Sequence, residues 1–325
     1  MTLSRRTCFR LGAGAAALPV FSRAARALDY PTRPVHWIVG FPPGGGADIV
    51  SRIMAAWLTE RLGQQVIIEN RPGAGTNIST DYVVRAAPDG YTLLWSGVSN
   101  AINASIFSDL TFDFLKDIVP VAGMVNYPLV LEVHPKVPAQ TIAELIALAK
   151  PEPRKLALAS YGTGTISQVA GELFKMRAGI EMVHVPYKGG APMVTDLLGG
   201  QVQAGIDVVA ASLPHIRSGA LRALAVLSTK RLEALPDVPT LAETLPGYEA
   251  VAFTGVGAPR GTPPEVIARL NREINAGLAD PAIRKRLDEL SVTPLVFTPA
   301  EYGAYMAAET AKWAKVIRAA IIQAK

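Results

Sequence analysis

Short apolar segments alternate with amphipathic segments along most of the chain. Residues 35–39 and 66–69 are apolar runs of strand length, while residues 47–62 repeat apolar side chains at helical spacing. The alternation returns over residues 129–227, and three helices that open with proline are predicted after residue 260. Strands that alternate with helices build parallel sheets covered by helices, so the pattern predicts an α/β fold.

Two of the predicted strands run into glycine-rich turns, and a predicted helix follows each turn at once. The first turn contains Gly44, Gly45 and Gly46, and the second contains Gly162 and Gly164. A glycine turn lets the backbone approach a ligand closely, while the helix behind it offers unpaired N–H groups and the positive end of its dipole. Two such helix ends that face each other would form a cleft for an anion without any charged side chain.

The order of the elements predicts two domains joined by two crossings of the chain. The first domain is discontinuous and comprises residues 28–125 and 250–325, whereas the second comprises residues 126–249. Two crossings make a hinge, and a hinge between two α/β lobes suggests closure around a ligand in the central cleft.

The first 27 residues are typical of an export signal rather than of folded structure. Arg5 and Arg6 precede a weakly apolar segment at residues 11–21, and Ala25 and Ala27 form a small-residue cleavage site. The arginine pair favours the twin-arginine export route over the general secretory route. An apolar segment of eleven residues is too short to span a bilayer, so cleavage near Ala27 and a periplasmic mature chain are expected.

Charge and cysteine content exclude several classes of protein. The formal net charge of the whole chain is +5, but the predicted leader holds five arginines and no acid, so the mature chain has no net formal charge. This balance leaves no basic surface that would indicate binding to nucleic acid. The only cysteine, Cys8, also lies in the leader, so a mature chain in an oxidising compartment would contain no disulfide.

Sequence motifs of enzymes are weak or missing. The dinucleotide-binding pattern G-x-G-x-x-G that starts at Gly44 has Ile49 where its third glycine should stand, although Glu69 lies where a ribose-binding acid is expected. No G-K-[S/T] phosphate loop and no G-x-S-x-G elbow occur, and the histidines are too scattered for a local zinc motif. We predict no catalytic residue, metal or cofactor, and the alternative is an exported α/β enzyme that acts on small organic acids.

The candidate ligand contacts are backbone groups of the glycine turns and polar side chains near helix starts. Asp48 and the hydroxyl groups after Gly162 either cap their helices or face the ligand, and both roles are compatible because the cap position is the ligand position. Tyr187 either contacts the ligand or covers the core, and Asp207 is an unusual acid within an apolar strand. The predicted ligand-binding residues are Phe41, Gly44, Gly45, Gly46, Ala47, Asp48, Ser96, Thr163, Gly164, Thr165, Ser167, Tyr187 and Asp207.

Several short motifs, in order, resemble one known family. They are FPPGGGAD at residues 41–48 with Arg52, VIIENRPGAG at 66–75, PDGYTL at 88–93, GTGT at 162–165, GELF at 171–174, HVPYKG at 184–189 and DVPT at 237–240. With these motifs the mature chain resembles the Bug-type extracytoplasmic solute receptors, the binding components of tripartite tricarboxylate transporters. One position departs from the family pattern, because relatives often have histidine where this chain has Gln168.

The resemblance implies a two-lobed periplasmic binding fold of type II, with a hinge and a central cleft. It also implies a receptor without enzymatic activity that holds a small carboxylate and delivers it to the membrane permease subunits of a tripartite transporter. In this family the backbone N–H groups of two loops grip the carboxylate, and the matching loops here are residues 41–48 and 163–167. A further alternative is a subunit that reports its ligand state to a membrane signalling protein.

Overall fold

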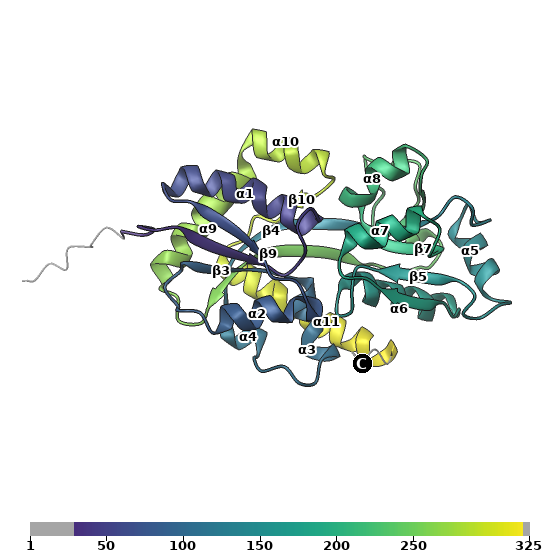
Figure 1. Ribbon diagram of the computed structural model, residues 1–325, viewed down its shortest axis with the longest axis horizontal. Coiled ribbons are helices and arrows are strands. Elements are labelled where there is room, and N and C mark those ends of the chain that lie inside the picture. The colour runs from purple at the N-terminus through teal and green to yellow at the C-terminus, as the bar shows by residue number, and fades with distance from the viewer. Residues whose placement is uncertain (1–28, 321–325) are drawn as a thin grey trace, which may run out of the picture.

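One long strand, β4 (Ile118–Val133), takes part in two sheets and so connects the two lobes of the protein. A computed structural model describes residues 29–320 (Figure 1), and the predicted leader at residues 1–27 lies outside these described residues. The strand order is β2-β1-β3-β9-β4-β7-β5-β6, and β8 and β10 also pair with β4. The other strands are β1 (Val35–Val39), β2 (Val66–Asn70), β3 (Thr92–Gly97), β5 (Ala157–Ser160), β6 (Val183–Pro186), β7 (Ala204–Val208), β8 (Arg222–Val226), β9 (Val251–Pro259) and β10 (Thr293–Pro294).

Some helices begin or end at residues that favour such positions. Gly63 adopts a left-handed conformation and ends the first helix, and Asp280 caps α10 by accepting bonds from two backbone N–H groups. The helices are α1 (Gly46–Leu62), α2 (Asn77–Val84), α3 (Val98–Ile106), α4 (Phe114–Asp117), α5 (Ile142–Ala149), α6 (Ile166–Ala178), α7 (Gly190–Leu198), α8 (Val209–Arg217), α9 (Pro264–Ala279), α10 (Pro281–Glu289) and α11 (Pro299–Ala320), with single 3-10 turns η1 (Ala74–Thr76) and η2 (Leu241–Glu243).

The first lobe is built around β1, which pairs in parallel with β2 and β3. Trp37, Ile38 and Val39 in this strand are fully buried because helices cover both faces of the sheet. Helices α1 and α9 pack together on one side of the sheet, and α3 packs with α11 on the other (Figure 1).

The second lobe contains the parallel strands β5, β6 and β7, with α6 on one side and α7 and α8 on the other (Figure 1). Ser167 in the first turn of α6 donates a hydrogen bond of 2.6 Å to the carbonyl of Ile206 in β7. This bond fixes the start of α6 to β7, which lies between β4 and β5 in the sheet.

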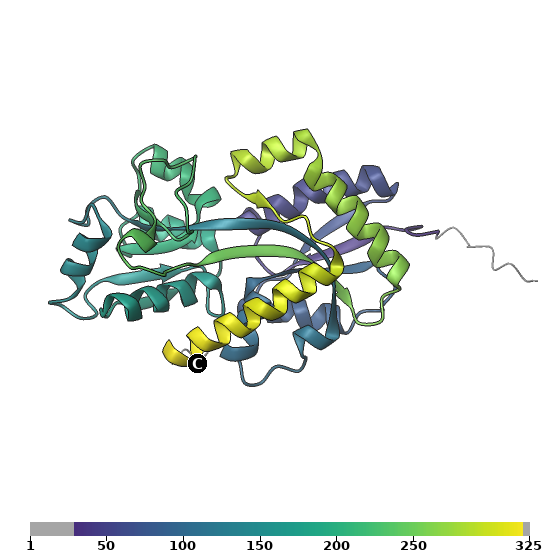
Figure 2. The ribbon, with the colours of Figure 1, turned by 180° about the vertical axis from the view of Figure 1, so that it is seen from behind.

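The two long strands β4 and β9 run antiparallel to each other and cross between the lobes (Figure 2). The α/β fold and its two lobes are confirmed, but the expectation of parallel sheets is wrong in part, because β4 pairs antiparallel with β7, β8, β9 and β10. A chain that leaves the first lobe along one strand and returns beside it must reverse its direction, which the alternation of strands and helices does not reveal. Within residues 29–320, no helix combines the length and the apolar character needed to cross a bilayer.

Candidate functional site

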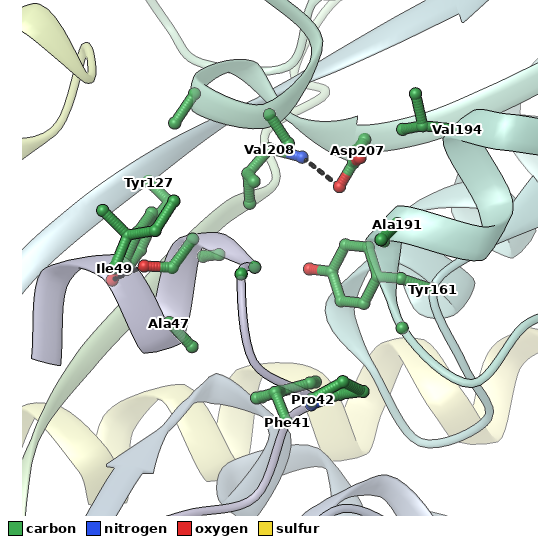
Figure 3. A pocket seen from close by; sticks show the side chains of 18 of the residues that line it. Phe41, Pro42, Ala47, Ile49, Tyr127, Tyr161, Ala191, Val194, Asp207 and Val208 are labelled. Carbon is green, nitrogen blue, oxygen red and sulfur yellow. Dashed lines mark hydrogen bonds between the residues drawn. The ribbon is translucent and has the colours of Figure 1, made fainter. Parts of the chain in front are cut away.

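A cavity of about 490 Å³ lies where the two lobes meet (Figure 3). This volume lies within the ordinary range of small-molecule sites. Aromatic and aliphatic side chains form most of its wall, and they are Phe41, Pro42, Pro43, Ile49, Trp95, Val98, Tyr127, Tyr161, Val194, Leu198, Val208 and Phe253. Of the described residues that line it, none is a lysine or an arginine, so an anion here would depend on N–H and O–H donors.

The loop between β1 and α1 forms the wall on the side of the first lobe. The helix starts at Gly46, and its N-cap residue, Gly45, supplies no side-chain hydrogen bond to the first turn. The free N–H groups and the positive end of the helix dipole therefore lie at the cavity wall. Gly46 also contacts the second lobe, because the hydroxyl of Tyr127 donates a 3.3 Å bond to its carbonyl oxygen.

Asp48 supports this loop from beneath rather than from the cavity side. Its carboxylate accepts bonds from the Gly44 backbone N–H at 3.0 Å, from Arg52 Nε at 2.9 Å and from Asn70 Nδ2 at 2.9 Å. Burial alone would raise the pKa of Asp48, but these bonds outweigh it and hold the pKa below its usual range. Asp48 is therefore ionised, and its hydrogen bonds hold the glycine turn in shape.

The wall on the side of the second lobe contains two further helix starts. The N-cap residues of α7 and α8 are Gly189 and Val208, and neither makes a side-chain cap bond. Both residues line the cavity together with the first helix start. Three uncapped helix N-termini from the two lobes thus converge on one space, which is the arrangement that favours bound negative charge.

One buried acid, Asp207, lies among these helix ends. Its Oδ1 atom accepts a 2.8 Å bond from the backbone N–H of Val208, and its Oδ2 atom has no hydrogen-bond partner among residues 29–320. Burial raises the pKa of Asp207 to about 7. On the neighbouring strand, burial followed by the charge of Asp207 raises the pKa of Glu132 to about 8, although a 2.7 Å bond from Ser212 opposes the shift.

The glycine turn before α6, which is the second of the two predicted ligand-binding loops, lies outside the cavity wall. Its Gly164 N–H donates to Gln168 Oε1 at 2.9 Å, so the residue that departs from the family pattern closes its own turn. A Cβ added at Gly164 would meet Asn103 and Phe107 of the first lobe at 2.6 and 2.8 Å. The turn therefore packs against the first lobe, and glycine is required there because nothing larger fits.

Two other predicted residues have partners elsewhere. Ser96 Oγ lies 2.9 Å from the hydroxyl of Tyr302, and Tyr187 donates a 2.7 Å bond to Asp196. The predicted residues in the cavity wall are Phe41, Gly44, Gly45, Gly46, Ala47 and Asp207, and those outside it are Asp48, Ser96, Thr163, Gly164, Thr165, Ser167 and Tyr187.

The predicted ligand contacts include Tyr187 before α7 but neither of the two glycines at the start of that helix. Gly189 and Gly190 form a glycine pair directly before a helix, which is the same device as the first turn. The sequence does not mark Trp95, Tyr127 and Tyr161 as cavity residues, because aromatic side chains in or next to strands usually belong to the core. Within the part of the chain that the structure describes, no three His, Cys, Asp or Glu side chains group into a metal site.

Comparisons with known proteins find relatives that match almost the whole chain. A family model described as tripartite tricarboxylate transporter family receptor matches residues 50–322. The protein BugT of Bordetella pertussis is 42% identical over 292 residues, which are 89% of this chain and 90% of that protein. A structure of R. palustris Rpa4515 with adipate has a TM-score of 0.88 and 37% identity, and covers 91% of this chain and 100% of that one. The structure of MatC from Rhodopseudomonas palustris with bound malate has a TM-score of 0.84 and 31% identity, and it covers 89% of this chain and 100% of that one.

Proposed function

The chain belongs to the tripartite tricarboxylate transporter family of receptors, and from this membership we propose that it is a periplasmic receptor for a small carboxylate. The observation that carries the proposal is the convergence of three uncapped helix N-termini on one cavity whose described wall contains no lysine or arginine. Backbone N–H groups would bind the carboxylate, and charge complement would come from the helix dipoles.

The apolar walls indicate what the rest of the ligand resembles. Phe41, Trp95, Tyr127 and Tyr161 surround the space beside the helix ends, so an aliphatic chain or a ring would be buried there. Adipate and malate are the acids in the two solved relatives, and both are small carboxylates. Adipate, malate and the ring-bearing acid benzoate are therefore suitable probes of carboxylate binding by this chain.

Binding would be coupled to closure of the two lobes. We propose that residues 28–125 with 250–325 and residues 126–249 move as the two domains, with the cavity between them. The ligand would contact helix ends from both domains at once, so it would bind the closed form better than the open form. The turn before α6 would support closure, because Gly164 packs against the first lobe.

We propose further that the closed, loaded form docks on the permease subunits of a tripartite transporter and that the protein catalyses no reaction. The family description supports the transport role. An assay of adipate, malate and benzoate after long incubation with the purified protein should recover each acid unchanged.

The proposal is tested by thermal stabilisation and by the fluorescence of Trp95, which lines the cavity. A true ligand at a hundredfold excess over its Kd should stabilise the folded state by about 2.7 kcal/mol. Stabilisation by glucose with none by adipate, malate or benzoate would contradict the proposal.

A variant of the first helix start tests the position of the site. A Cβ at Gly46 would lie 3.4 Å from Val208 Cγ2 and 3.5 Å from Tyr127 Cε1, so a valine side chain there would fill the space between the lobes. We expect Gly46→Val to weaken carboxylate binding at least about tenfold, since it obstructs closure. Ala56→Val, on the exposed face of the same helix, is the matched control. Equal binding by both variants would place the ligand elsewhere.

A further inference from the structure

An acid lies in the wall of the cavity that the proposed function assigns to an anion. Asp207 is 1% exposed, and only its Oδ1 atom has a partner, the backbone N–H of Val208 (Figure 3). The start of α7 lies directly beside the other oxygen, because a Cβ added at Gly190 would be 3.4 Å from Oδ2. The free oxygen of Asp207 is therefore at the same helix end that would attract the ligand.

No lysine or arginine in the described wall balances this acid. The titratable groups that face Asp207 or share its cavity are Glu132 and Tyr127 of β4, Tyr161 after β5 and His215 of α8. The acid of α7, Asp196, accepts a bond from Tyr187 instead, and on the far side of the sheet Glu172 of α6 pairs with Lys175. Glu132 adds a second buried carboxyl group on the neighbouring strand, 0% exposed.

Two negative charges side by side in such a site would repel strongly, because the buried surroundings screen charge far less than water does. A carboxylate ligand and an ionised Asp207 therefore exclude each other. One of them must carry a proton when both occupy the cavity.

Resting on the proposed function, we propose that Asp207 binds the ligand as a neutral acid, and that its Oδ2 atom donates a hydrogen bond to a carboxylate oxygen of the ligand. The proton comes from solvent, and no covalent bond of the ligand forms or breaks. Each bound carboxylate thus enters with one proton whenever Asp207 was ionised before binding. Burial already raises the pKa of Asp207 to about 7, so the acid gains this proton readily near neutral pH.

The proton uptake can be counted by titration calorimetry in two buffers with different ionisation enthalpies. With adipate, malate or benzoate as probe, we expect uptake of about 0.9 proton per ligand at pH 8 and about 0.1 at pH 6, from linkage to a group with a pKa near 7. The Kd should be about tenfold weaker at pH 8 than at pH 6. Release of protons on binding, or a Kd that is tighter at pH 8 than at pH 6, would overturn the inference.

Asp207→Asn keeps a hydrogen-bond donor at this position but cannot titrate. We expect this variant to bind the same probe with no proton uptake and with a Kd that changes less than about twofold between pH 6 and pH 8. Asp196→Asn, an acid-to-amide change in α7 outside the cavity wall, is the matched control and should keep the uptake.

The outcomes separate this inference from the proposed function. If none of the three acids binds, the proposed function fails, and the inference fails with it. If an acid binds without proton uptake at pH 8, only the inference is overturned. Uptake that persists in Asp207→Asn and disappears in Glu132→Gln or His215→Gln also overturns it. If Asp207→Asn does not fold, Glu132→Gln and His215→Gln make the assignment, because uptake that is retained in both variants is expected only when Asp207 takes up the proton.

Discussion

Replacing Glu132 by glutamine should stabilise the protein at neutral pH. Glu132 is fully buried in β4, and within the described residues its side chain makes a single hydrogen bond, which its Oε1 atom accepts from Ser212. A glutamine has nearly the same shape, and its side-chain oxygen can accept the same bond. The substitution therefore removes an ionisable group while it preserves the packing.

The magnitude follows from the shifted pKa. Burial, and then the charge of Asp207, raises the pKa of Glu132 from 4.5 to about 8. A raised pKa means that the contribution of this group to stability is complete below pH 4.5 and is lost as the pH rises through 8. At pH 7 this loss is about 3 kcal/mol, because the unfolded chain ionises the group and the folded chain does not. Glu132→Gln should recover this amount at pH 7 and almost nothing at pH 4.

The assay is urea unfolding at pH 4 and pH 7, with thermal melts beside it. A gain of about 3 kcal/mol corresponds to a rise in Tm of about 5 °C for a chain of this size. Glu233→Gln, at an exposed loop position, changes the same charge without burial and should leave the stability unchanged at both pH values. The reasoning is refuted if Glu132→Gln destabilises the protein at pH 7, or if its gain is equal at pH 4 and pH 7.

Two further changes test the support of the cavity. Asp48→Asn removes the charge that accepts bonds from Gly44 and Arg52, so urea unfolding should show a loss of about 2 kcal/mol at pH 7. Because the pKa of Asp48 is lowered, that loss should vanish as the pH falls below 3.8, and a constant loss would contradict this account. Tyr302→Phe removes a bond to Ser96 and should cost about 1 kcal/mol in thermal melts. Carboxylate affinity should stay the same in Tyr302→Phe, since Tyr302 and Ser96 lie outside the cavity wall, and a changed Kd would show otherwise.

Local spacing was enough to predict the first half of the site. The strand at residues 35–39, the glycine turn and the helix after it are all set by neighbours in sequence, and Gly44, Gly45 and Gly46 line the cavity as expected. The sequence also singles out Asp207, which lines the cavity, because an acid within an apolar strand is unusual.

The other half of the site depends on strand order, which local spacing does not contain. Helices α6, α7 and α8 all start after strands of one sheet, and a glycine turn marks two of these starts. Only the neighbours of each strand decide which helix start opens on the cavity. The turn at Gly164 was predicted to face the ligand, but the structure packs it against Phe107, and Gly189 takes the place in the wall.

The connection between the lobes has a mechanical consequence. The chain crosses on β4 and β9, and these strands are hydrogen-bonded to each other from Ile118 to Pro128. A pair of joined strands bends and twists as one ribbon, whereas two separate loops would swivel freely. The proposed opening of the lobes therefore has to bend this ribbon, and the elasticity of the paired strands opposes that motion.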